Sequence, residues 1–140
     1  MAAVYLDASA LVKLCVQDRG SVLAAALWER ADLVLTSRVS DAQVPAALAR
    51  ARSTGVAGAR EVDAALERWS VARGALYVVE ATAAQGERAG ALAARHTLRA
   101  DDAWHLAAAL TVATPGSLLA TWDSRLGTAA TAEGLVVVPW

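Results

Sequence analysis

The sequence is short of cysteine and of net charge, and each shortage excludes a class of protein. Its 140 residues contain one cysteine, Cys15, which rules out an internal disulfide and a cysteine metal cluster. Because Cys15 falls on the apolar side of an expected helix, we expect it to be a small core residue. The formal net charge of −1 gives no overall basic field. Binding of nucleic acid would therefore depend on a local patch or on metal ions.

Long hydrophobic runs are also missing, although 56% of the residues are hydrophobic. The longest apolar runs fall far short of the roughly 18 to 20 residues that cross a membrane, so we expect no membrane association. Residues 1–7 lack a basic leader and include Asp7, so we expect no secretory signal and a cytoplasmic location. The generous apolar content favours a protein partner or a homodimer.

Length and periodicity predict one domain over residues 1–140, in which strands alternate with one or two helices. Such an order is typical of a mainly parallel sheet of about five strands covered on both faces, a three-layer α/β/α sandwich. The strands are expected at residues 3–6, 33–36, 76–79, 118–122 and 135–138, and the helices at 8–16, 20–31, 43–52, 59–72, 82–96, 101–110 and 124–131.

The sequence leaves two possibilities for the residue at which the third helix begins. Ser40 and Gln43 fit a Ser-x-x-Gln capping box, which predicts a helix beginning at that point. Proline has no backbone N–H and fits a helix without distortion only in the first turn. Because of Pro45, the regular helix either begins nearer Gln43 or carries a small distortion. Gly74 is expected to end the fourth helix.

Aspartates stand at several expected helix starts. Asp101 and Asp102 precede a largely apolar helix, and a capping role explains one of them but not both. Asp7 and Asp123 each follow a strand and precede a helix, which places them at the carboxyl edge of a parallel sheet, where ligands bind. N-capping alone also explains each of these two acids taken singly.

Three carboxylates at one edge would repel one another, and their pKa values would rise unless a cation held them together. Asp7, Asp102 and Asp123 therefore predict a site for a hard divalent cation, Mg²⁺ or alternatively Mn²⁺, whose bound water can serve as a nucleophile. Spacing alone is weak support, because only the fold can bring these distant acids together.

Residues 4–14, 98–107 and 121–126 resemble the three signature stretches of PIN-domain ribonucleases, in particular the VapC toxins of prokaryotic toxin–antitoxin pairs. The stretches occur in the family's order and separations over nearly the whole chain. The resemblance implies a PIN-like fold, Mg²⁺-dependent endoribonuclease activity on an RNA substrate, neutralisation by a cognate VapB-like antitoxin encoded next door, and a homodimer.

The same resemblance assigns catalytic and metal-binding roles to Asp7, Asp102 and Asp123, with Ser9 and Thr121 as supporting hydroxyl residues. The second of the adjacent acids falls at the family position because it directly precedes the Ala-Trp-His-Leu-Ala string.

One segment departs from the family pattern, because Gln43 stands where the family usually has Glu. An amide oxygen can coordinate a metal or orient water, but it brings no charge and cannot act as a base. Asp41 lies on nearly the opposite helix face and is a poor substitute. Gln43 therefore indicates a weakened catalytic site or an inactivating change, natural or engineered. His105, inside an apolar helix, is expected to be a hydrogen-bonded core residue rather than a ligand.

Basic residues near the expected site could steer RNA. Lys13, Arg38 and Arg99 are the candidates, and the charges of Arg50 and Arg52 are explained equally well as solvated helix-face charges.

Two rival functions remain open. A phosphatase could use Asp7 as a covalent nucleophile, but that chemistry usually needs a second acid two residues on, where this chain has Ser9. The second rival is a catalytically impaired PIN-like protein that acts by binding an antitoxin or another protein.

Overall fold

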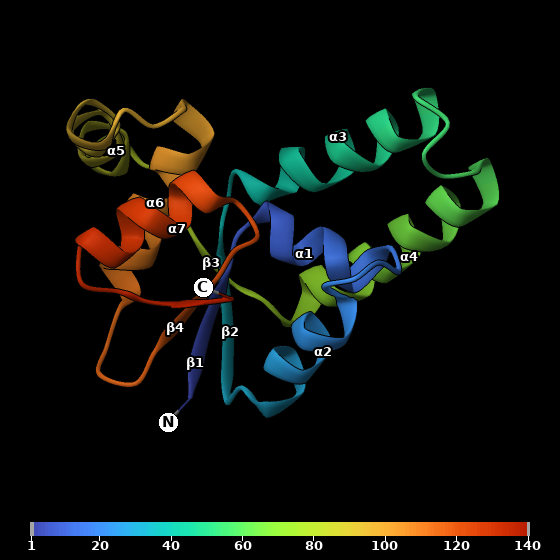
Figure 1. The fold of residues 1–140 in the computed structure, drawn as a ribbon, viewed down its shortest axis with the longest axis horizontal. Helices are drawn as coiled ribbons and strands as arrows, with labels where there is room; N and C mark the ends of the chain where they lie inside the picture. Colours follow the sequence, from blue (N-terminus) through green and yellow to red (C-terminus); the bar gives the residue numbers. More distant parts are fainter. Residues whose placement is uncertain (1, 140) are drawn as a thin grey trace.

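The computed structural model describes residues 2–139, which are built around one five-stranded sheet (Figure 1). Every strand pairing in it is parallel, and the order is β3-β2-β1-β4-β5. The predicted parallel sheet is confirmed. Its strands are β1 (Ala3–Leu6), β2 (Leu33–Ser37), β3 (Tyr77–Val79), β4 (Leu118–Ala120) and β5 (Val136–Val138).

The central strand β1 is apolar on both faces. Ala3 and Tyr5 pack into one buried cluster, whereas Val4 and Leu6 pack into the other. Because side chains alternate along a strand, a run that is apolar at every position requires cover on both faces of the sheet.

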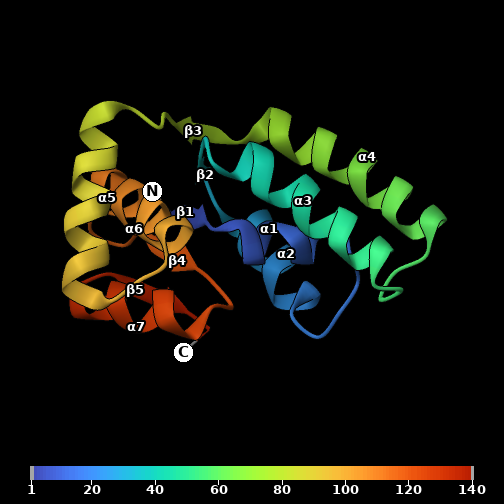
Figure 2. The same cartoon turned by 90° about the horizontal axis from the view of Figure 1, so that it is seen from above.

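Helices provide this cover, so the predicted three-layer α/β/α sandwich is confirmed. One core cluster takes residues from α5, α6 and α7, and the other takes residues from α1, α3 and α4 (Figures 1 and 2). The bounds are α1 (Ala8–Cys15), α2 (Ser21–Arg30), α3 (Ser40–Ser53), α4 (Ala59–Ala75), α5 (Ala83–His96), α6 (Ala100–Val112) and α7 (Ser124–Ala132).

Helices α3 and α4 form an arm. Figures 1 and 2 show the two helices side by side and projecting away from the sheet, with residues 54–58 joining their far ends. Gly55 in this connection has φ +78°, a left-handed conformation that glycine adopts without steric cost. The chain leaves the sheet along α3 and returns along α4 to β3, so the start of α3, with Gln43, lies next to the end of β2.

The capping-box prediction at the start of α3 was wrong. The helix begins at Ser40, but Val39 is the N-cap residue and makes no side-chain capping bond. The Ser40 hydroxyl is buried and hydrogen-bonded to the Thr36 hydroxyl at 2.7 Å, so it is not available to the helix amides. Pro45 lies inside the helix, which continues through it to Ser53.

Among the other boundaries that differ from the predictions, two concern residues singled out in the sequence. Helix α4 continues through Gly74 to Ala75, and α6 begins at Ala100, before the acidic pair. The second difference makes both acids part of the helix's first turn.

Cys15 is confirmed as a core residue. It is 1% exposed, and burial raises the pKa of its thiol to about 11. Of the helices formed by residues 2–139, none is both long and apolar enough to pass through a lipid bilayer.

Candidate active site

The candidate site lies at the point where the strand order reverses. From β1 the chain adds β2 and β3 on one side, and β4 and β5 lie on the other. Asp7 directly follows β1, and Asp123 follows the neighbouring strand β4. Ligands of open α/β sheets bind outside the carboxyl ends of the strands at such a switch point.

Asp7 is 3% exposed, and its carboxylate is fixed by three donors. One carboxylate oxygen accepts from the Ala10 backbone N–H at 2.9 Å and from the Ser9 hydroxyl at 2.6 Å. The other oxygen accepts from the Thr121 hydroxyl at 2.5 Å. Both predicted supporting residues therefore contact Asp7 directly.

The two hydroxyl groups also connect Asp7 to the end of β4. The Trp122 backbone N–H donates to Ser9 Oγ at 2.9 Å, and the Asp123 backbone N–H donates to Thr121 Oγ1 at 3.0 Å. These bonds hold the segment that carries Asp123 against the start of α1.

Asp123 is the N-cap of α7. One of its carboxylate oxygens accepts from the backbone N–H groups of Arg125 and Leu126, at 2.9 and 3.1 Å. Asp7 caps α1 in the same way. Both acids therefore have a structural role besides any role in a site, as the capping interpretation expected.

Asp102 has no such explanation. The N-cap of α6 is Arg99, which makes no side-chain capping bond, and Asp102 is 7% exposed. Its pKa is raised to about 6, mainly by burial and then by the negative charges of Asp123, Asp101 and Asp7. Arg99 opposes this shift by a smaller amount. The structure therefore brings Asp7 and Asp123 close enough to Asp102 to influence its ionisation.

Whether this set suits a divalent cation depends on its chemistry and its spacing. Carboxylate oxygens are the donors that Mg²⁺ prefers, and the raised pKa of Asp102 is the mark of negative charge without a counter-charge. The spacing is not that of a preformed centre, since no group of three His, Cys, Asp or Glu within residues 2–139 is close enough to hold an ion. The donor types fit, and binding would require these carboxylates to close on the ion.

Gln43 of α3 contacts His105 of α6. Its side-chain oxygen lies 2.6 Å from His105 Nε2, while His105 Nδ1 lies 2.8 Å from the Tyr5 hydroxyl oxygen. His105 is 2% exposed, and burial lowers its pKa. The interpretation of His105 as a hydrogen-bonded core residue is confirmed. Tyr5 was missed because nothing in a buried strand marks one hydroxyl as a partner for a histidine 100 residues away.

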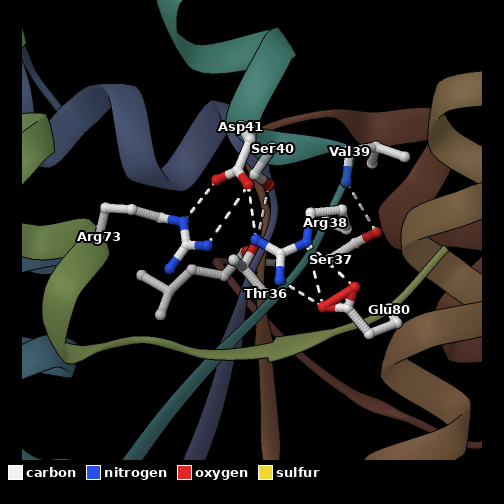
Figure 3. Close-up of polar contacts among 9 residues, drawn as sticks. Thr36, Ser37, Arg38, Val39, Ser40, Asp41, Arg73 and Glu80 are labelled. Atoms are coloured by element: carbon white, nitrogen blue, oxygen red, sulfur yellow. Dashed lines mark hydrogen bonds and ion pairs between the residues drawn. The ribbon is translucent and has the colours of Figure 1, made fainter.

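Asp41 and Arg38 belong to an ion-pair cluster beside the start of α3 (Figure 3). Arg38 pairs with Asp41 at 2.8 Å and also with Glu80, and Arg73 pairs with Asp41 at 2.5 Å. The hydrogen bond from Arg73 is the largest cause that lowers the pKa of Asp41. Asp41 therefore faces two arginines rather than replacing the carboxylate that Gln43 lacks.

A cleft of about 590 Å³ runs between α1 and α3 and reaches the start of α6. Two of the predicted RNA-steering residues, Lys13 and Arg99, line it, whereas Arg38 does not. The Lys13 ammonium pairs with Asp18 at 3.0 Å and lies 5.3 Å from the centre of the Trp122 ring. The cleft walls are Ala8, Ser9, Val12, Lys13, Ala42, Gln43, Ala46, Ala47, Arg50, Arg99 and Asp101.

The fold and the site define an open parallel α/β protein whose acidic residues gather at the switch point of its sheet. Residues 4–131 match the family model described as PIN domain. The chain belongs to the PIN-domain family. Within it the chain groups with the VapC proteins: it is 45% identical over 139 residues to Ribonuclease VapC45 of Mycobacterium tuberculosis (strain CDC 1551 / Oshkosh), covering 99% of this chain and 96% of that protein.

Solved structures show the same fold at low sequence identity. VapC20 of Mycobacterium tuberculosis, described as a sarcin-ricin loop cleaving toxin, superposes with a TM-score of 0.70 at 20% identity, covering 95% of this chain and 96% of that one. VapBC2 of Rickettsia felis, bound to a DNA fragment from its promoter, gives a TM-score of 0.64 at 10% identity, with 96% of each chain covered.

Proposed function

We propose that this chain is a Mg²⁺-dependent endoribonuclease toxin that cleaves RNA phosphodiester bonds and is neutralised by a cognate VapB-like antitoxin. The observation that carries the proposal is the buried Asp102, whose pKa is raised to about 6 first by burial and then by the charges of Asp123, Asp101 and Asp7. The likeness to a protein named Ribonuclease VapC45, over 99% of the chain, supports RNA as the substrate.

In this proposal Asp7, Asp102 and Asp123 hold the ion, with Mn²⁺ able to replace Mg²⁺. When bound, the ion supplies a water of lowered pKa and neutralises charge on the scissile phosphate. The hydroxyl groups of Ser9 and Thr121 fix the Asp7 carboxylate by donating to different oxygens, so that its remaining lone pairs have a set direction.

Local positive charge would attract the RNA backbone although the net charge is −1. Lys13 and Arg99 line the cleft together with Arg50, so they are the stronger candidates. Arg38 is the weaker one, because Asp41 and Glu80 already pair with its guanidinium.

Both the surface of this chain and its family membership favour binding to protein partners. VapBC2 was solved as a complex, and exposed large hydrophobic side chains on this chain favour contact with an antitoxin and with a second copy in a homodimer. The most exposed of these side chains are Val22, Val56, Val71, Tyr77 and Val136.

The test is incubation of the protein with a mixed RNA pool in Mg²⁺ and in EDTA, with Asp7→Asn alongside. The wild type is expected to cleave RNA in Mg²⁺ only, and Asp7→Asn is expected to be inactive. Equal behaviour of the two proteins, with binding of the antitoxin retained, would instead support the impaired PIN-like protein that acts through protein binding.

Gln43→Glu is expected to raise affinity for Mn²⁺ by about tenfold, because a carboxylate adds negative charge beside the other acids and keeps an oxygen for His105. Calorimetric titration of both proteins measures the change. Gln17→Glu adds the same charge at an exposed position and is the matched control. Equal affinities of the wild type and Gln43→Glu would contradict the idea that Gln43 weakens the site.

A further inference from the structure

A buried chain of hydrogen bonds ends at Gln43, on the wall of the cleft. It begins at Tyr5 in the central strand, passes through His105 in α6 and reaches Gln43 in α3. Tyr5 and His105 are both 2% exposed, whereas Gln43 is half-buried and lines the cleft beside Lys13 and Arg99. These hydrogen bonds therefore connect the protein interior to the cleft, where RNA would bind under the proposed function.

The chemistry of the amide sets the direction of these bonds. The oxygen of a glutamine side chain only accepts hydrogen bonds, and its nitrogen only donates them. With Gln43 Oε1 at 2.6 Å, His105 Nε2 must carry a proton and donate it. Burial keeps the imidazole neutral, so Nδ1 is unprotonated and accepts from the Tyr5 hydroxyl at 2.8 Å.

In this orientation of the Gln43 side chain, the amide nitrogen is the group that can bind a ligand in the cleft. Gln43 Oε1 is occupied by His105, and no residue in the range 2–139 accepts a hydrogen bond from Gln43 Nε2. The amide nitrogen is not buried without a partner, so solvent reaches it. The group of Gln43 that has no protein partner is therefore its amide N–H donor, whereas its oxygen already accepts a hydrogen bond from His105.

We propose that Gln43 binds a phosphate oxygen of RNA through its amide N–H, and that His105 is the positioning residue that fixes this orientation. The choice of RNA rests on the proposed function, and the donor character of Gln43 rests on the contacts alone. Gln43 is thus a substrate contact in a cleft that two cationic side chains, Lys13 and Arg99, also line.

The tautomer of His105 tests the orientation in the unaltered protein. In a two-bond ¹H–¹⁵N correlation spectrum of the imidazole rings, we expect a protonated Nε2 and an unprotonated Nδ1 for His105. A proton on Nδ1 with a bare Nε2 would overturn the proposal, because Gln43 would then have to turn its nitrogen toward His105 and its oxygen toward the cleft.

RNA binding in EDTA tests the contact without cleavage. The probe is a fluorescent single-stranded RNA oligonucleotide of mixed sequence, and the readout is anisotropy. Loss of a hydrogen bond to a charged group predicts about tenfold weaker binding by Gln43→Met and a larger loss for Gln43→Glu, which adds repulsion. Gln17→Met and Gln17→Glu are the matched exposed controls and are expected to bind within about twofold of the wild type.

The outcomes separate this proposal from the nuclease proposal. Wild-type affinity in Gln43→Met, or absence of RNA binding by the wild type in EDTA, would overturn the contact. A protein that binds RNA through Gln43 but cleaves none in Mg²⁺ would overturn the nuclease activity and leave the contact standing.

Discussion

Asp102→Asn is expected to reduce Mg²⁺-dependent RNA cleavage by at least about a hundredfold. Asp102 is the carboxylate that no capping role explains, and its pKa is raised by burial and, to a smaller extent, by the charges of Asp123, Asp101 and Asp7. Asparagine keeps the size of the side chain but removes the charge that a divalent cation requires. The measurement is the initial rate of cleavage of an RNA pool at a fixed Mg²⁺ concentration.

Asp101→Asn is the matched control for this experiment. It removes the same charge from the adjacent position, where the side chain is 46% exposed and lies near Arg99. We expect its cleavage rate to remain within a few-fold of the wild type. Similar losses in both variants would show that overall charge, and not the position of Asp102, determines activity.

The second large effect is on stability in the absence of metal. Because the pKa of Asp102 rises from 3.8 to about 6 on folding, its ionised form destabilises the folded protein by about 3 kcal/mol above pH 6. Asp102→Asn removes this cost, so the free energy of unfolding at pH 8 in EDTA is expected to increase by up to about 3 kcal/mol. Chemical denaturation measures the difference.

The sign of the pH dependence follows from the direction of the shift. Between about pH 4 and pH 6 the folded wild type binds more protons at Asp102 than the unfolded chain does, so its stability falls as the pH rises through this window. The advantage of Asp102→Asn should therefore disappear near pH 4. A gain that is the same at pH 4 and pH 8, or no gain at pH 8, would contradict the electrostatic origin of the raised pKa.

The sheet and the position of two acids could be predicted because they depend on local patterns. Short apolar runs separated by amphipathic helices predicted the parallel sheet, and a strand followed directly by Asp7 or Asp123 predicted their place at its carboxyl edge. The start of α3 was predicted incorrectly, because the Ser40 hydroxyl is hydrogen-bonded to Thr36 of the preceding strand β2 rather than to an amide of its own helix.

Contacts between distant segments lay beyond sequence reasoning. The bond between Gln43 and His105 joins residues 62 positions apart, and the pairing of Arg73 with Asp41 spans 32. Neither has a local signature, since glutamine and arginine on a helix surface are usually solvated. The departure at Gln43 was visible in the sequence, but the orientation of its amide follows only from its contact with His105 of α6.

The role of the carboxylates is tested most directly by soaking crystals of the protein in Mn²⁺ and locating the ion by its anomalous scattering. We predict one Mn²⁺ site in contact with Asp7, Asp102 and Asp123, with these side chains closer together than the spacing described above. Mn²⁺ bound elsewhere, or no Mn²⁺ at these three acids, would contradict a metal-dependent active site at the switch point of the sheet.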